Sequence, residues 1–351
     1  MAPAKETRHR IDWVDYAKGI CIILVVMMHS TLGVEKAAGA ESWLNGFIDW
    51  ARPFRMPDFF LISGLFLAAR IDRPWREYLD SKVVHFAYFY ILWMTIQFGL
   101  RGPGIYAADG AGALGQAYLT GYVQPYGTLW FIYMLAVFFI VVKWLRSASP
   151  VIVFIFAAAL EAMPIDTGWL PVDEFAARFV YFYAGYWLAS WVFAWADHVN
   201  TRSMAAILSG LFIWGMANGA LVASGIATLP LASLALGFIG AGAVVATGVL
   251  FSKLSFMGWL RYCGENSIVI YLAFVLFMAA TRTILLKVGF PPDLGAVSLI
   301  VTAVSVTGAV ILHRVTRGTR LDILFRRPAW AKLPVSAVDV VGRNRREVHN
   351  I

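Results

Sequence analysis

The sequence predicts an all-α, polytopic integral membrane protein with about ten transmembrane helices. Hydrophobic residues make up 60% of the 351 residues and charged residues only 14%, whereas an ordinary globular protein has about 45–50% apolar and about 25% charged residues. The excess lies in repeated apolar blocks along the whole chain. A soluble enzyme and a disordered chain are therefore both excluded.

Ten apolar segments are separated by polar or charged residues. They cover residues 17–34, 54–69, 83–100, 128–145, 151–163, 175–195, 204–224, 229–250, 265–286 and 294–313. The segment 151–163 is short and is the weakest of these candidates. Because a bilayer offers backbone groups no hydrogen bonds, each segment is a helix or a strand of a closed barrel. Runs such as residues 20–28 are continuously apolar rather than alternating, so helices are predicted.

Lysine and arginine residues are distributed unevenly between the two sides of these segments. With the N-terminus inside, 22 of the 29 fall on the inner side and seven on the outer side. Cytoplasmic loops carry the excess of such residues, so both termini are predicted to be cytoplasmic. We expect residues 11–316 to form the membrane domain and residues 317–351 a basic cytoplasmic tail that can touch anionic lipid.

Two other kinds of site receive no support. A net charge of +8 would suit a nucleic-acid partner, but the positive charges follow the predicted topology, so no such partner is expected. Cys21 and Cys263 form no C-x-x-C motif and no Cys/His cluster. Neither a disulfide framework nor a metal site is predicted.

Ionisable side chains inside a spanning helix are costly and need an explanation. Lys18 and His29 are 11 residues apart in the first segment; at about 100° and 1.5 Å per residue they share one helix face, about 16 Å apart along the axis. A histidine near mid-membrane can take and return a proton near neutral pH. Two interpretations remain open, a catalytic base and a histidine that only hydrogen-bonds between helices.

Asp58 follows Pro57 at the predicted outer start of the second helix. An acid is favourable near the positive N-terminus of a helix; alternatively, Asp58 pairs with His29 and sets its tautomer. Arg52 and Arg55 lie nearby in the sequence. They either hold an anionic acceptor, pair with Asp58 or anchor the helix at the interface.

Three arginines, Arg70, Arg73 and Arg76, lie close together on the predicted inner side. Such a group suits phosphate binding, although the positive-inside rule explains it nearly as well. Before them, the pair Ser63-Gly64 is more typical of close helix packing than of a nucleophile.

The predicted outer loop 101–127 contains seven glycines. It also carries, with the residue just beyond it, five aromatic side chains: Tyr106, Tyr118, Tyr122, Tyr126 and Trp130. The loop is either a mobile connector or a surface on which a sugar stacks.

Four stretches together resemble the membrane acyltransferase 3 family over roughly residues 11–315. The first is Asp15-Tyr-Ala-Lys18-Gly-Ile with His29 after it, and the second is the run 55–67 with its Pro, paired Phe and Ser-Gly. The three arginines resemble the basic loop of the family, and 264–272 resembles its late signature. The branch that is most similar is the fucose 4-O-acetylase-like one.

This resemblance implies a multi-pass O-acyltransferase of the bacterial inner membrane. It implies that the enzyme transfers an acyl group, acetyl first of all, from cytoplasmic acetyl-CoA to a hydroxyl of a carbohydrate or glycolipid on the outer face. Acetyl-CoA is then a substrate and no cofactor is permanently bound. The expected roles are catalytic for His29, Lys18 and Asp58, CoA-binding for Arg70, Arg73 and Arg76, and acceptor-binding for Arg52, Arg55, Tyr126 and Trp130. Membrane lipid and a second copy of the chain are the other expected partners.

The sequence departs from the family at one position of the late signature. Relatives often have a histidine three residues after the tyrosine Tyr271, and here that position is Phe274. Other residues of this stretch, Glu265, Asn266 and Ser267, are expected to cap the following helix. Succinyl transfer to a periplasmic glucan, a proton-coupled sugar or lipid transporter and a structural membrane protein all remain open as alternatives.

Overall fold

A computed structural model describes residues 11–334 of the chain, and within this range every regular element is helical. The all-α prediction is confirmed. The α-helices are α1 Asp12–Ala38, α2 Leu44–Gly64, α3 Trp75–Leu79, α4 His85–Thr120, α5 Trp130–Trp144, α6 Pro150–Ala162, α7 Leu170–Trp187, α8 Ala189–Asn200, α9 Met204–Ala223, α10 Pro230–Ser252, α11 Gly258–Glu265, α12 Ser267–Val288 and α13 Leu294–Thr316.

Seven segments of the described range have the length and apolar composition needed to cross a membrane. They are Asp12–Ala38, Trp75–Thr120, Gly127–Ser147, Met204–Ala223, Pro230–Ser252, Ser267–Val288 and Leu294–Thr316. The prediction of a multi-pass membrane protein is confirmed. The count of ten spans and the cytoplasmic termini stay predictions, because α2, α6 and α7 do not reach the same standard.

The chain divides into two compact units, each built from two separate stretches of sequence. Of the described residues, the first unit holds 11–62 and 190–307, and the second holds 63–189 and 308–334. The first unit thus joins the beginning of the chain to its later helices, and the second joins the middle of the chain to the end of the described range.

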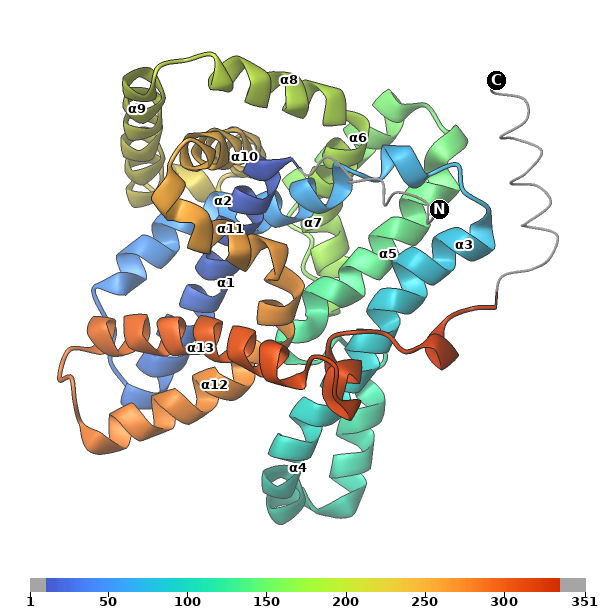
Figure 1. Cartoon of the computed structure of the whole chain (residues 1–351), viewed down its shortest axis with the longest axis vertical. Helices are drawn as coiled ribbons and strands as arrows, with labels where there is room; N and C mark the ends of the chain where they lie inside the picture. Colours follow the sequence, from blue (N-terminus) through green and yellow to red (C-terminus); the bar gives the residue numbers. More distant parts are fainter. Residues whose placement is uncertain (1–10, 335–351) are drawn as a thin grey trace, which may run out of the picture. The chain divides into compact units, whose positions relative to one another are not determined.

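Helix α1 is the centre of the first unit, where it packs against α10, α11 and α12 (Figure 1). Glycines allow this close approach. A Cβ atom on Gly248 would meet the backbone oxygen of Trp13, and one on Gly264 would meet the backbone oxygen of Asp15. Small residues let membrane helices pack backbone to backbone in this way. Arg261 adds an ion pair from α11 to Asp12, 3.3 Å long, at the start of α1.

Helix α2 begins at Leu44, ten residues before the predicted start at residue 54. The prediction that Asp58 lies at a helix N-terminus is therefore wrong. Pro53 and Pro57 suggested a start because proline lacks an N–H group and favours the first turn of a helix. Here both prolines lie inside the helix, which membrane helices tolerate when neighbouring groups satisfy the freed carbonyls.

Two other predictions about segment limits also need correction. The single segment 175–195 is two helices, α7 and α8, which are interrupted at Leu188 with φ −97° and ψ 18°. The predicted loop 101–127 is mostly helical, because α4 continues to Thr120 and reverses at Gly110, where φ is 81°. Figure 1 shows the two arms of α4 that result.

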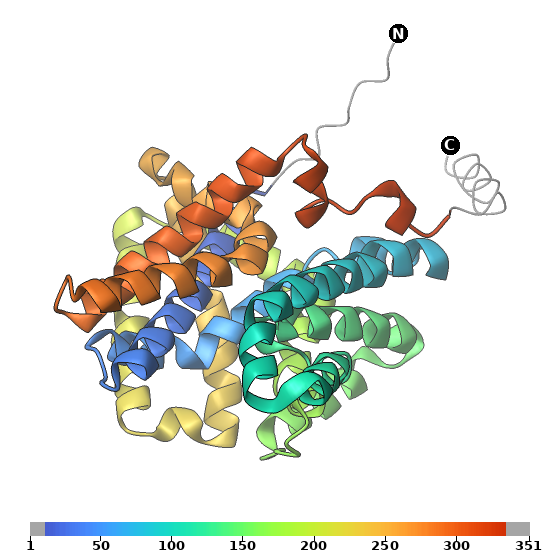
Figure 2. The ribbon, with the colours of Figure 1, turned by 90° about the horizontal axis from the view of Figure 1, so that it is seen from below.

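The described part of the predicted tail makes several hydrogen bonds within the second unit. Arg327 donates to the carboxylate of Asp80 at 2.5 Å, and the backbone N–H of Leu333 donates to the same carboxylate at 2.7 Å. The indole of Trp93 on α4 donates to the carbonyl of Leu324 at 2.9 Å. Figure 2 shows this red segment beside the start of α4. The predicted basic tail continues to residue 351, and its part 335–351 lies outside the described residues.

The acid just before α13 gives a first testable prediction. Asp293 accepts hydrogen bonds from the indole of Trp43 at 3.0 Å and from the backbone N–H of Ala296 at 2.6 Å. These two hydrogen bonds, of which the one from Trp43 has the larger effect, hold the pKa of the Asp293 carboxyl below its ordinary value. A lowered pKa in the folded state stabilises the fold above the unfolded pKa, about 3.9, and this contribution is lost as the pH falls through the folded pKa.

Wild type is therefore expected to lose stability relative to Asp293→Asn as the pH falls below about 4. Thermal unfolding of both chains in the same detergent at pH 3–7 measures this. A difference in melting temperature that stays constant over this range would contradict the assignment.

Candidate functional site

Helix α1 carries Lys18 and His29 on one face, as their spacing predicts, because the helix runs without interruption from Asp12 to Ala38. The ammonium group of Lys18 lies 3.8 Å from the carboxylate of Asp15. A partly exposed pair at this distance contributes little to stability. Lys18 is thus placed at the same end of α1 as the acids Asp12 and Asp15, and His29 lies about 16 Å further along the helix axis.

His29 is partly buried and stacks on an aromatic ring of α12. Its ring centroid lies 5.6 Å from that of Phe274, with an interplanar angle of 29°. Phe274 is a fully buried residue of α12, so the side chain that this helix places against His29 is apolar. Arg55 of α2 is close enough to His29 to interact electrostatically with its ring. The structure therefore places His29 and Arg55 within electrostatic range of each other.

Asp58 is fully buried, with 0% of its surface exposed. Neither of its carboxylate oxygens has a hydrogen-bond partner among the described residues. The alternative in which Asp58 hydrogen-bonds to His29 is therefore not seen among the described residues, and the thiol of Cys21 on α1 lies within electrostatic range of this carboxyl group. A buried polar group without a partner is costly and is typical of a functional site.

The two arginines of α2 have different environments. Arg52 is exposed, whereas Arg55 is buried and donates to the backbone carbonyl of Ile48 at 3.4 Å. The two are three residues apart on one helix, so the environment of each depends on what packs beside it. Of the pair, Arg55 is the one that lies near His29.

Two hydroxyl groups directly after His29 were not expected from the sequence. Ser30 and Thr31 are fully buried, and their hydroxyl oxygens have no hydrogen-bond partner among residues 11–334. Serine and threonine are common packing residues in membrane helices, so nothing in the sequence distinguishes these two. Together with Asp58 they give the first unit several buried polar atoms that a bound molecule can satisfy.

The three arginines of the predicted phosphate site lie in the second unit. Arg73 donates to Glu77 at 2.6 Å, Arg76 is exposed, and Arg70 is partly exposed in the short 3₁₀ helix 68–70. The segment that carries them is held by Lys143 of α5. The ammonium group of this lysine donates to the backbone carbonyls of Ile71 and Arg73, the latter at 2.7 Å.

Lys143 is only 1% exposed and also lies 5.0 Å from the ring centre of Tyr78. From the sequence alone, Lys143 counts only as one of the positive charges on the predicted inner side. The available signal was its place at the end of a continuously apolar helix, where a buried charge needs a specific partner.

Replacing Lys143 by methionine is expected to lower the free energy of unfolding by about 2–4 kcal/mol, because two carbonyls lose a charged donor. The matched control is Arg146→Met, since Arg146 is largely exposed and its ion pair to Asp72 is 3.8 Å long; it should cost less than about 1 kcal/mol. Denaturant unfolding in detergent, followed by tryptophan fluorescence, compares the two. Equal losses would mean that the carbonyl contacts of Lys143 contribute nothing of their own.

Tyr126 and Trp130 also lie in the second unit, Tyr126 between α4 and α5 and Trp130 on α5. The hydroxyl of Tyr126 and the amide nitrogen of Gln97 are both buried and have no hydrogen-bond partner among the described residues. The guanidinium of Arg101 lies 5.8 Å from the ring centre of Tyr126. Trp130 begins α5 and packs edge-on against Phe131. Gln97 is a residue that the sequence did not single out, because one glutamine in an apolar helix carries no motif.

The late signature has a packing role that is visible in the structure. Asn266 stands at the N-cap position of α12, but its side chain makes no cap hydrogen bond and donates instead to the carbonyl of Tyr262 at 2.9 Å. The predicted cap is therefore absent. Gly264 contacts the backbone of α1. In the Ser63-Gly64 pair the close packing is confirmed for the glycine, because a Cβ atom on Gly64 would meet the backbone oxygen of Phe182.

Comparison with known protein families matches residues 11–314 to the family described as an acyltransferase domain, acyltransferase 3. The match covers nearly all of the membrane-spanning part. The chain belongs to this family.

Two relatives are similar to this acyltransferase-family chain at a distance. The inner membrane protein YcfT of Escherichia coli (strain K12) is 25% identical over 229 residues, which are 57% of this chain and 63% of that protein. The nodulation protein NolL of Mesorhizobium japonicum is 24% identical over 177 residues, 49% of this chain and 47% of that protein. The matched part is less than two thirds of the length of either relative. No solved structure matches the chain.

Proposed function

We propose that this protein is a membrane O-acyltransferase that moves an acyl group, acetyl first of all, from cytoplasmic acyl-CoA to a hydroxyl of a carbohydrate or glycolipid on the outer face. The observation that carries the proposal is the position of His29. It lies on an uninterrupted membrane helix of a chain that belongs to an acyltransferase family, within electrostatic range of Arg55 and followed by the buried hydroxyl groups of Ser30 and Thr31.

The chemistry requires a base within the membrane. The neutral imidazole of His29 takes the proton of the acceptor hydroxyl, and the oxygen bonds to the thioester carbon. The carbon–sulfur bond breaks, and the leaving thiolate of CoA receives the proton from the imidazolium, so that CoA thiol and an ester are the products. Arg55 would stabilise the negative charge that develops on the carbonyl oxygen.

The donor and acceptor would be held by different residues. Arg70, Arg73 and Arg76 suit the phosphates of CoA, because guanidinium groups form paired hydrogen bonds to phosphate. Tyr126 and Gln97 offer buried polar atoms without partners, and Trp130 offers an aromatic face, which together suit a sugar. Lys18 would hold one end of the path near the membrane surface, and Asp58 would hold a polar group of a substrate. The similarity to an inner membrane protein supports a bacterial inner-membrane location.

Membrane vesicles with the full-length chain test this proposal. Label from acetyl-CoA should appear in the cell-envelope carbohydrate fraction with wild type and not with His29→Ala or with vesicles that lack the protein. If label is transferred from succinyl-CoA but not from acetyl-CoA, the transferred group is succinyl instead of acetyl, and the protein is still an acyltransferase. Sugar-coupled proton flux without acyl-CoA, and no label from either donor, would establish a transporter instead.

A further inference from the structure

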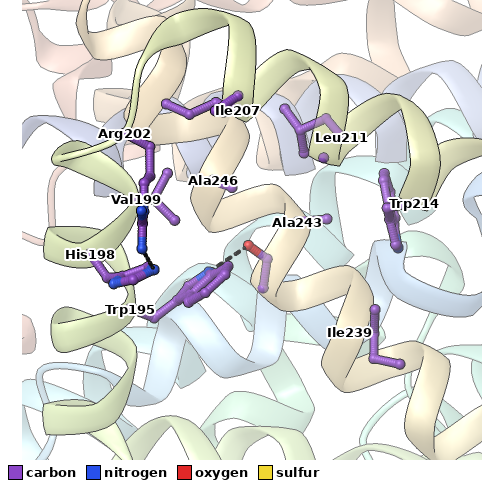
Figure 3. A pocket seen from close by; sticks show the side chains of 13 residues that line it. Trp195, His198, Val199, Arg202, Ile207, Leu211, Trp214, Ile239, Ala243 and Ala246 are labelled. Atoms are coloured by element: carbon purple, nitrogen blue, oxygen red, sulfur yellow. Dashed lines mark hydrogen bonds between the residues drawn. The ribbon is translucent and has the colours of Figure 1, made fainter.

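The first unit contains a cavity of about 630 Å³ between α8, α9 and α10 (Figure 3). This volume lies within the range of about 300–1,000 Å³ that is usual for ligand pockets. Each of the three helices contributes one face to the walls. The lining residues are Trp195, His198 and Val199 of α8 and Arg202 just after it; Ala206, Ile207, Gly210, Leu211 and Trp214 of α9; and Ile239, Gly242, Ala243 and Ala246 of α10. None of the residues of the proposed acyl-transfer site lines it.

One end of this pocket is basic. Arg202 lies 3.0 Å from the ring nitrogen of His198, and the ring of His198 stacks on Trp195 at 5.9 Å. Lys253, directly after α10, donates to the carbonyls of Asn200 at 2.8 Å and Arg202 at 3.3 Å. Its charge opposes the negative end of the α8 dipole and lies beside the backbone of Arg202, although Lys253 itself does not line the pocket.

No acidic side chain is among the described residues that line the pocket. Asp197 is the acidic residue of α8, and it does not line the pocket; the sequences of α9 and α10 contain no acid. Helix α9 also starts directly after Arg202, capped by Ser203, so its positive end lies at the same place. An anionic group is favoured here.

The rest of the pocket is apolar. From Ala206 to Trp214 its wall extends about 12 Å along α9, and the residues of this wall and of the facing wall on α10 are alanine, glycine, leucine, isoleucine and tryptophan. Both helices are long and apolar enough to cross the membrane. A pocket between two membrane-spanning helices is open to lipid, and here an anionic head would lie at the helix ends and a hydrocarbon chain along the apolar walls.

We propose that this pocket binds one anionic glycerophospholipid, with the phosphate at Arg202 and an acyl chain between α9 and α10. A lipid fits because the basic end and the apolar walls belong to one continuous pocket. A single occupant must therefore carry both an anionic group and a hydrocarbon chain. The head-group phosphate lies at the ends of α8 and α9, and the chain follows the helix axes toward Trp214.

Photolabelling of the full-length protein in detergent tests this assignment. The probe is phosphatidylglycerol with a diazirine in one acyl chain, and the matched probe is phosphatidylcholine with the same chain. We expect phosphatidylglycerol to label peptides of α9 and α10 that contain 206–214 and 239–246, at least about fivefold more strongly than phosphatidylcholine does.

Two variants separate the head from the chain. Arg202→Gln should lower labelling by phosphatidylglycerol about fivefold and leave labelling by phosphatidylcholine unchanged. Gly210→Leu should lower labelling by both lipids, because a Cβ atom on Gly210 meets nothing within 4 Å and the side chain enters the pocket. Leucine also has a higher helix propensity than glycine, which protects the fold of α9. The control is Arg320→Gln, which removes an exposed arginine of the second unit and should change nothing.

Equal labelling by the two lipids in wild type would overturn the proposal, since it would mean ordinary boundary lipid. Free inorganic phosphate is added as a competitor at the same concentration as the labelled phosphatidylglycerol. If it abolishes labelling, the proposal is overturned as well, because the site would then recognise the anion without the chain. Labelling that is unchanged in both Arg202→Gln and Gly210→Leu would place the lipid elsewhere.

Discussion

Replacing His29 by alanine is expected to lower kcat for acyl transfer by about 10²–10⁴-fold, which is the usual contribution of a positioned general base. The KM for acetyl-CoA should change little, because the histidine acts on the acceptor hydroxyl and not on the donor. Initial rates with labelled acetyl-CoA, in vesicles with matched amounts of protein, measure both constants.

A second variant distinguishes proton transfer from packing. His29→Gln keeps a polar side chain next to Phe274 and Arg55 but cannot take a proton at neutral pH. If His29 is the base, the glutamine chain should be as inactive as the alanine chain. Added imidazole should restore part of the rate of His29→Ala, because the cavity left by the ring can hold the free base. A glutamine chain that keeps more than about one tenth of the wild-type rate would contradict this role.

The matched control for both variants is His85→Ala. His85 begins α4 in the second unit, where its ring packs edge-on against Phe89 at 5.0 Å. It has no place in the proposed reaction, so its removal should leave kcat and KM within about twofold of wild type. The comparison separates the loss of a catalytic histidine from the loss of a buried aromatic contact.

The positions of the membrane helices could be predicted where a long, continuously apolar segment forms a single helix. Helix α1 is one such case, and because it is uninterrupted the 11-residue spacing of Lys18 and His29 could be converted directly into a shared face. The break at Leu188 could not be found in this way, since the residues on both sides are apolar and neither proline nor glycine stands there. The glycines of α4 suggested a loop, although among them only Gly110 has a positive φ, the backbone conformation that favours glycine.

The candidate site was predictable to the extent that it lies in short motifs. Lys143 and Gln97 were missed because their importance depends on residues far away in the sequence: Lys143 contacts the carbonyls of Ile71 and Arg73, and Gln97 lies near Gly127. The Asp58 prediction failed for a related reason, since the start of α2 determines its environment and two prolines gave a misleading signal.

Replacing Gly264 by alanine is expected to lower the free energy of unfolding by about 1–3 kcal/mol, the usual cost of overpacking a close contact. The added Cβ atom would meet the backbone oxygen of Asp15 and the backbone nitrogen of Gly19 on α1. A backbone oxygen cannot rotate away as a side chain can, so α1 and α11 must move apart. Thermal unfolding in detergent measures the loss.

Helix α11 contains its own control for this variant. Gly258 is the first residue of the same helix, and a Cβ atom there meets nothing within 4 Å, so Gly258→Ala should be neutral or slightly stabilising. Because α1 is one continuous helix, we expect a shift at Asp15 to displace His29 as well. Gly264→Ala should therefore also lower kcat, and a displacement of about 1 Å at a catalytic group can cost about 10²-fold. Equal stability of the two alanine chains would show that the α1–α11 contact is looser than the structure indicates, and it would remove the link from this glycine to the catalytic histidine.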